Sequence, residues 1–469
     1  MNLYLKNKKL LEENHSYDSS LEHDACGVGL IASLDGKKRR QIVEYGIESL
    51  KAVWHRGAVD ADGKSGDGAG ICVEIPRDFF LEKIKDTGHE HKDEKEICVG
   101  MIFLPKTEYS MQEKSKTIVE QVLLENDFYI YGWRQVPVNP NVLGTTADSN
   151  RPEITQVIFK SNKSIKRNEL ERLLFISRKK MLKITRSQQI DDFYVCSLSS
   201  RSIVYKGMFL AEALSDFYPD LNDQKFISRF AIFHQRFSTN TFPSWKLAQP
   251  FRCLAHNGEI NTLKGNINWM KIHEQDMSSE FFNNEDLKPI VTPGNSDSAA
   301  LDNVFELLIH SGKSTPLIKL MMMPDAWSKR SKILPKAHQQ LFDVLNSTIE
   351  PWDGPAAICA TDSKWVIAAT DRNGLRPLRY SITSDNILCA GSETGMVQIP
   401  ESKIKSKGRL GPGQLIAVNL KKGKIYRDKD IKDYLSKDYK KFHKQIIHLD
   451  KKIITEKEFI NFSNEDLGR

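Results

Sequence analysis

The stretch that decides the fold is His23-Asp24-Ala25-Cys26-Gly27-Val28-Gly29, which leads directly into an apolar run that ends at Leu34. A short run of Val, Leu, Ile and Ala that follows a polar segment predicts a buried β-strand. A cysteine therefore stands immediately before a predicted core strand. The first 25 residues are polar, and we expect them to be poorly ordered.

Further strand-like runs, many of them rich in Val, Ile, Phe and Tyr, follow along the chain. They are 70–75, 97–104, 193–199, 202–205, 230–234, 356–360, 365–370 and 387–390. Several neighbouring runs are separated by short polar turns such as Asp362-Ser363, a pattern typical of hairpins. The sheets are therefore predicted to be mostly antiparallel.

Helix-like segments lie between these runs. Apolar residues recur at helical spacing over 168–183, and again after Asp297 in a segment closed by Gly312. Shorter segments of the same kind span 45–53 and 263–273. Sheets with helices packed outside them predict an α+β layered architecture.

Composition places the chain among globular proteins, with 40% hydrophobic and 28% charged residues in 469. No apolar run approaches the roughly 18 residues that a membrane helix needs. The N-terminal residues lack the apolar core of a secretory signal. We therefore expect a cytoplasmic protein with no membrane partner.

The seven cysteines are scattered and form no Cys-x-x-Cys pair. This pattern argues against disulfides, a metal site or an iron–sulfur cluster held by this chain. We expect most of these thiols to be small core side chains.

The net charge of +7 lies in one segment. Residues 421–452 contain 12 Lys and Arg against 5 Asp, so the rest of the chain is balanced. Alternating charges of this kind are typical of a solvated or docking face. Nucleic-acid binding is the weaker alternative, and we expect no nucleic-acid partner.

Taken one by one, the polar motifs have ordinary structural explanations. Asn257-Gly258 is a common turn dipeptide. Arg236 is compatible with a surface ion pair, and Asp297 with the favoured negative charge near a helix N-terminus.

The joint occurrence and order of these motifs favour a shared functional role over these separate explanations. The runs that matter are Cys26-Gly27-Val28-Gly29, His55-Arg56-Gly57-Ala58, Ser65-Gly66-Asp67-Gly68-Ala69-Gly70-Ile71, RFSTNTFPSWKLAQPF (236–251), AHNGEINT (255–262), Ser296-Asp297-Ser298-Ala299 and DRNGLRP (371–377).

In this order, the runs resemble the class II glutamine amidotransferases, which are N-terminal-nucleophile hydrolases. Among these they are most similar to the amidotransferase domain of the glutamate synthase large chain. The resemblance implies an α+β fold, a four-layer αββα sandwich of mostly antiparallel sheets, over residues 26–430. It also implies that residues 1–25 are a propeptide and that 431–469 begin a linker to an absent central and synthase region.

The resemblance also implies a nucleophile and its base. Cys26 is the expected nucleophile, and cleavage after Ala25 would free its α-amine. That amine, with a reference pKa of about 7.7–8.0, suits a general base near neutral pH. This base is needed because a free thiol is only slightly ionised at pH 7.

The remaining site residues carry expected roles from the same resemblance. Asn257 and Gly258 match the oxyanion hole, and Arg236 matches the residue that holds the substrate α-carboxylate. Asp297 matches the partner of the α-ammonium group. Arg56 matches an arginine near the nucleophile and Thr239 is a candidate hydroxyl contact, whereas His55 and His256 are expected to be structural.

The resemblance assigns the rest of the reaction to regions that this sequence does not contain. In glutamate synthases, ammonia reaches 2-oxoglutarate at a site with FMN and an iron–sulfur cluster, supplied by an electron-donor partner. We expect no cofactor in this chain, and glutamine hydrolysis as its own activity. Whether the chain is a fragment or a split-gene product stays open. The alternative is a non-catalytic or unprocessed docking module that retains the fold.

Overall fold

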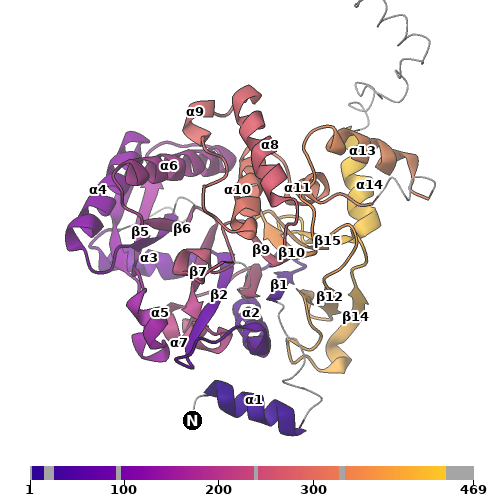
Figure 1. The fold of residues 1–469 in the computed structure, drawn as a ribbon, viewed down its shortest axis with the longest axis horizontal. Coiled ribbons are helices and arrows are strands. Elements are labelled where there is room, and N and C mark those ends of the chain that lie inside the picture. The colour runs from indigo at the N-terminus through magenta and orange to yellow at the C-terminus, as the bar shows by residue number, and fades with distance from the viewer. Residues whose placement is uncertain (1–2, 15–25, 91–96, 237–240, 327–332, 440–469) are drawn as a thin grey trace, which may run out of the picture.

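The computed structural model describes residues 3–14, 26–90, 97–236, 241–326 and 333–439 (Figure 1). Its strands form sheets of seven, five and four strands, and their pairings are antiparallel. The seven-stranded sheet has the order β14 (Ile404–Arg409), β12 (Arg379–Thr383), β13 (Ile387–Gly391), β1 (Gly27–Ser33), β8 (Phe230–Gln235), β2 (Ser65–Glu74) and β7 (Ser202–Phe209). The five-stranded sheet has the order β16 (Lys424–Tyr426), β15 (Leu415–Asn419), β11 (Trp365–Thr370), β10 (Ala356–Thr361) and β9 (Leu254–Gly258).

The seven- and five-stranded sheets pack face to face. Alternate side chains of β10 show this, because Ala357 and Cys359 belong to the core that contains Val28 of β1. Ile358, on the other face of β10, packs instead among the helices outside the five-stranded sheet. This alternation follows from the two-residue period of a strand.

Helices cover the outer faces of both sheets. Helix α2 (Arg40–Ala52) packs on β1 and β8, with Ile42, Val43 and Leu50 fully buried. Helices α10 (Asp297–His310) and α11 (Thr315–Met322) lie on the side of the five-stranded sheet. The result is four layers, helix–sheet–sheet–helix, and the predicted α+β sandwich of mostly antiparallel sheets is confirmed.

A third core lies beside this sandwich. The four-stranded sheet has the order β4 (Phe128–Gln135), β5 (Glu153–Ser161), β3 (Cys98–Leu104) and β6 (Tyr194–Ser199). Helices α4 (Tyr109–Glu125) and α6 (Arg167–Ser187) pack against it and against each other (Figure 1). The remaining α-helices are α1 (Leu3–Asn14), α3 (Arg77–Asp86), α5 (Thr145–Ser149), α7 (Leu214–Phe217), α8 (Leu263–Asp276), α9 (Asn284–Leu287), α13 (Lys336–Asn346) and α14 (Asp428–Tyr439).

Two helices lie where the sequence predicted the ends of the domain. The expected poor order of the N-terminal segment is wrong for residues 3–14, which form α1 because they are rich in the strong helix formers Leu, Lys and Glu. The expected boundary at residue 430 falls inside α14. Helix α14 packs beside α13, and its Ile431 and Leu435 are buried (Figure 1).

None of the helices that the structure describes combines the length and the apolar character needed to cross a membrane.

Candidate active site

Cys26 lies immediately before β1, close to the centre of the seven-stranded sheet. It is partly exposed, whereas most of the other cysteines are buried. Burial raises the pKa of the Cys72, Cys196 and Cys389 thiols to about 12, which disfavours their thiolate forms. Accessibility therefore favours Cys26 as the reactive thiol.

The two packed sheets meet at Cys26. The side-chain amide of Asn257, near the end of β9, donates a hydrogen bond to the Cys26 carbonyl oxygen across 2.6 Å. The Asn257 side chain is buried. A hydrogen-bond donor of the five-stranded sheet is thus fixed beside the predicted nucleophile of the seven-stranded sheet.

Gly258 follows Asn257 and has a backbone conformation that only glycine tolerates well. Its φ is +154°, and a Cβ at this position would lie 1.8 Å from the Pro355 carbonyl oxygen. Any side chain would therefore push β9 away from the start of β10. The Asn-Gly dipeptide thus serves this close approach of two strands.

Arg236 lies just after β8, with its side chain buried. Its backbone N–H donates to the Gly68 carbonyl oxygen at 2.8 Å, and its Nη2 donates to Thr241 Oγ1 at 2.5 Å. Burial lowers the pKa of the guanidinium group, while the charges of Asp67, Cys26 and Asp297 oppose that shift. The structure thus brings Arg236 within electrostatic reach of two other predicted site residues.

Asp297 begins α10, and Ser296 caps that helix by accepting from the backbone N–H of Ala299 at 3.3 Å. One Asp297 carboxylate oxygen accepts a hydrogen bond from the backbone N–H of Ile260 at 2.9 Å. The carboxylate thus has a fixed position beside the segment that follows Gly258. It is also partly exposed, with 23% of the side chain accessible, so an amino group can reach it.

His256 and its neighbour His234 make structural contacts near the candidate site. His256 Nδ1 lies 2.7 Å from Ser298 Oγ, and its carbonyl oxygen lies 3.1 Å from His234 Nε2. Burial lowers the pKa of the His256 imidazole, so it stays neutral near pH 7. These contacts join β9 to α10 and to β8.

Arg56 contacts Glu393, a residue that the sequence analysis did not single out. Arg56 Nε donates to Glu393 Oε1 at 2.6 Å, and His55 Nε2 lies 3.0 Å from Glu393 Oε2. The neighbouring Ser392 bonds to the backbone of Val28, two residues after Cys26. No sequence signal marks Glu393, because a single glutamate after a strand is an ordinary surface residue.

Asp67 is the other acidic residue that the sequence did not assign. It is buried in the glycine-rich start of β2, and its Oδ1 accepts from the Ala58 backbone N–H at 3.3 Å. The motif that contains it was recognised only as part of the family pattern. Thr239 lies outside the described residues.

Within the described ranges, no group of three or more His, Cys, Asp or Glu side chains is arranged to hold a metal ion.

Comparisons with known proteins agree with the motifs. The profile of the family described as glutamine amidotransferases class-II matches residues 26–444. The chain is 53% identical over 453 residues to the glutamate synthase [NADPH] large chain of Azospirillum brasilense, which covers 96% of this chain and 30% of the relative. Over 428 residues it is 40% identical to the glutamate synthase [NADPH] large chain of Bacillus subtilis, covering 90% of this chain and 28% of the relative.

A ferredoxin-dependent relative is similar too. Ferredoxin-dependent glutamate synthase 2 of Synechocystis is 43% identical over 422 residues, which is 89% of this chain and 27% of the relative. The chain thus spans less than a third of the length of these relatives. Among solved structures, the allosteric regulatory enzyme of purine biosynthesis aligns over 86% of this chain and 49% of its own, with a TM-score of 0.35 and 15% identity.

Proposed function

This chain belongs to the class II glutamine amidotransferases, and from that premise we propose that it hydrolyses L-glutamine to L-glutamate and ammonia as the amidotransferase part of a glutamate synthase. The observation that carries the proposal is the 2.6 Å contact between the Asn257 amide and the Cys26 carbonyl oxygen. It joins Cys26, the partly exposed thiol of the motif set, to a buried donor.

The chemistry begins with removal of residues 1–25, which leaves Cys26 with a free α-amine. The amine takes the thiol proton as Sγ attacks the side-chain carbonyl carbon of glutamine. The tetrahedral intermediate then collapses, the C–N bond breaks, and ammonia leaves with the proton that the amine held. Water, deprotonated by the same amine, hydrolyses the thioester and releases glutamate.

Asn257 and Gly258 stabilise the charge that develops in this reaction. The side-chain amide of Asn257 and the backbone N–H of Gly258 are the donors to the oxyanion. Each preorganised donor of this kind lowers a barrier by about 2.7–4 kcal/mol. The burial of Asn257 strengthens its interaction, because water is excluded from the donor.

Arg236 and Asp297 select the substrate. A guanidinium group suits bidentate binding of the α-carboxylate, and the Asp297 carboxylate suits the α-ammonium group. This pair of opposite charges distinguishes free glutamine from glutamine within a peptide. Arg56, held by Glu393, is the candidate for orienting the groups around Cys26, and Thr239 stays a candidate hydroxyl contact.

The proposal places the ammonia-consuming half elsewhere in a longer protein. Ammonia would pass to 2-oxoglutarate in a synthase region that carries FMN and an iron–sulfur cluster and receives electrons from a donor protein. The support is that the relatives named glutamate synthase are more than three times as long as the matched part. A cytoplasmic location completes the proposal.

The deciding experiment compares Cys26→Ala with Cys389→Ala. We expect Cys26→Ala to abolish both glutamine hydrolysis and labelling by a glutamine-mimicking electrophile. Cys389→Ala removes another partly exposed thiol and should retain both. Full activity of Cys26→Ala would refute the proposal.

The alternative is an unprocessed docking module that retains the amidotransferase fold. The mass of the intact protein distinguishes the two, because the processed form begins at Cys26. A chain that keeps residues 1–25 and binds no glutamine would favour the docking module.

A further inference from the structure

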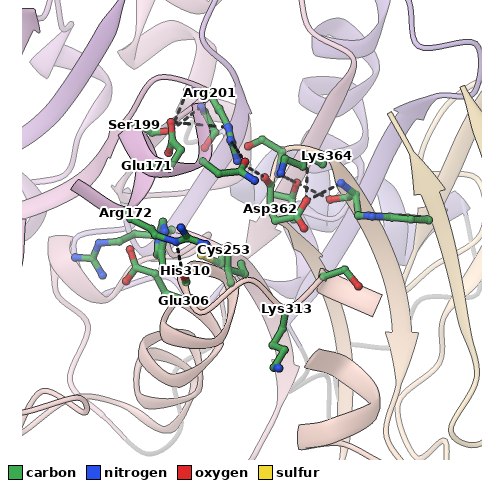
Figure 2. Close-up of a pocket in the computed structure, with 18 of the residues that line it drawn as sticks. Glu171, Arg172, Ser199, Arg201, Cys253, Glu306, His310, Lys313, Asp362 and Lys364 are labelled. Carbon is green, nitrogen blue, oxygen red and sulfur yellow. Dashed lines mark hydrogen bonds and ion pairs between the residues drawn. The ribbon is translucent and has the colours of Figure 1, made fainter. Parts of the chain in front are cut away.

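A cavity of about 230 Å³ is drawn in Figure 2. It lies at the end of the sandwich opposite Cys26. Strand β10 connects the two ends, since Ala356 pairs with Gly258 at the candidate site and Thr361 lines the cavity. At about 3.3 Å per residue, this strand separates them by roughly 16 Å. The cavity is therefore distinct from the glutamine site.

The cavity is lined by α6, the β6–β7 turn, the end of α10 and the β10–β11 turn, together with the segment before β9 and the loop that follows α10. Figure 2 shows charged side chains from α6, both turns and α10 around it. Its cationic residues are Arg172, Arg201, Arg252, Lys313 and Lys364, and its carboxylates are Glu171, Glu306 and Asp362. Burial lowers the pKa of His310 to about 4, so this residue adds no charge near neutral pH.

Two of these charges have partners that compensate them. Glu306 forms a buried ion pair with Arg178 at 2.5 Å, and Arg252 forms one with Asp302 at 3.8 Å. Of the four other cations and two other carboxylates in the cavity wall, Arg201 and Glu171 form an ion pair at 3.9 Å, which leaves Arg172, Lys313 and Lys364 against Asp362.

Both remaining carboxylates are already occupied by hydrogen bonds. Glu171 accepts from Ser199 Oγ at 2.8 Å, from the Ser200 backbone N–H at 2.8 Å and from Ser200 Oγ at 2.6 Å. Asp362 Oδ1 accepts from the backbone N–H groups of Lys364 and Trp365 at 2.8 and 2.7 Å. Their oxygens are committed to holding the two turns.

The cations, by contrast, are held largely by neutral groups. Arg201 Nη2 donates to Asn168 Oδ1 at 2.7 Å, and Arg172 Nε donates to the His310 carbonyl oxygen at 2.8 Å. Arg201 Nε lies 3.9 Å from Glu171, which is an ion pair but too long for a hydrogen bond. Among the described residues, the Lys313 and Lys364 ammonium groups have no ion-pair or hydrogen-bond partner.

The surroundings add to the positive potential. Burial and the neighbouring Arg201 lower the pKa of Lys364, and burial with Arg77 and Arg201 lowers that of Arg167. An anion in the cavity would relieve this repulsion.

We propose that this cavity binds a compact dianion that carries a phosphate group, with Arg201 and Lys364 as its main charged ligands. Guanidinium groups match phosphate oxygens in bidentate geometry. The hydroxyl groups of Ser202, Ser314 and Ser363 line the same cavity from different elements. Within the described part of the chain none of these three hydroxyls donates a hydrogen bond, so they are available for a tetrahedral oxyanion.

The test is calorimetric titration of inorganic phosphate into the full chain at constant ionic strength. We expect saturable binding at one site, weakened about tenfold or more in both Lys364→Gln and Arg201→Gln. Lys405→Gln removes the same charge from an exposed position on β14 and should leave affinity unchanged. The absence of saturable binding, or equal affinities in Lys364→Gln and Lys405→Gln, would overturn the proposal.

Two controls keep the test decisive. Lys364 is exposed and unpaired within the described residues, so Lys364→Gln decides the question even if Arg201→Gln fails to fold. Titrations with glycerol 3-phosphate and malonate identify the ligand class. Tighter binding of glycerol 3-phosphate than of inorganic phosphate supports a phosphate ester, and weaker binding supports free phosphate. Malonate binding as tight as phosphate binding would overturn the assignment.

Discussion

The Asp297 carboxylate accepts a hydrogen bond from the Ile260 backbone N–H at 2.9 Å, which ties the first residue of α10 to the segment after β9. Strand β9 itself carries Asn257 and Gly258. The proposed ammonium-binding group and the proposed oxyanion donors are therefore positioned by one connection, and their separation is set by the fold.

Asp297→Asn should weaken glutamine binding without unfolding the protein. The asparagine carbonyl oxygen can still accept from Ile260, but the negative charge is lost. Loss of a hydrogen bond between charged groups costs about 1.5–3 kcal/mol, so we expect kcat/KM for glutamine to fall roughly 10–150-fold. Steady-state kinetics measure this, with urea unfolding as the check. An unchanged KM and kcat/KM would contradict the proposed role.

Asn257→Ala should act on the transition state. We expect kcat to fall about 10²–10³-fold with little change in KM, because the oxyanion donor acts only after attack. Asn266→Ala is the matched control, since Asn266 is also a buried asparagine and donates to the Pro351 carbonyl oxygen at 2.9 Å. Its loss should lower stability and leave kcat near the wild-type value. Equal kcat losses in the two variants would argue against an oxyanion role.

Glu393 and Arg56 should act as one unit. Their 2.6 Å contact is partly exposed, with about a quarter of each side chain accessible. We therefore expect Glu393→Ala and Arg56→Ala each to reduce kcat/KM, and the double variant to reduce it by little more than either one. A double-mutant cycle on glutamine hydrolysis measures the coupling. Strictly additive losses would show that Glu393 does not position Arg56.

The sequence predicted many of the strands that have a clear apolar pattern, although it missed β15, whose sequence LIAVN is equally apolar. Strands such as β1, β8 and β10 are continuous apolar runs, because helices or a second sheet cover both faces. Strand β14, with the sequence IKSKGR, has no such run because it is at a sheet edge and alternates with charged residues. Strand β9 is short and ends in Asn257-Gly258, which resembles a turn in the sequence.

The same distinction applies to the candidate site. The family motifs identified Cys26, Asn257 and Asp297 because each lies in a run with a distinctive order. Glu393 was missed because its role depends on a contact with Arg56, 337 residues away. The predicted boundary at 430 falls within α14, because the alternating charges of this segment concealed a buried face where Ile431 and Leu435 recur at helical spacing.

That buried face makes a prediction about truncation. Ending the chain at residue 430 removes Ile431 and Leu435, which together should cost about 3–6 kcal/mol of unfolding free energy. It also removes Lys432, which bonds Asp325 at 2.7 Å, and leaves that carboxylate buried without its partner. A chain that ends at residue 439 retains α14 and is the control. Equal urea midpoints for the two truncations would contradict the prediction.

A last prediction concerns pH and His234. Burial, together with Arg236 and His256, lowers the pKa of His234 from 6.5 to about 3. In the unfolded chain His234 therefore becomes protonated near pH 6.5, whereas in the folded chain it becomes protonated only near pH 3. Stability from neutral His234 is present above pH 6.5 and is lost as pH falls towards 3, at up to about 1.4 kcal/mol per pH unit.

His234→Gln keeps an N–H donor for the His256 carbonyl oxygen but cannot titrate. We expect urea unfolding between about pH 6 and pH 4 to show a slope smaller by nearly one proton than in the wild type. Groups such as Asp302 and His310 titrate in both proteins and cancel in the comparison. Equal slopes would mean that His234 is already protonated in the folded protein over this pH range, which would contradict the prediction.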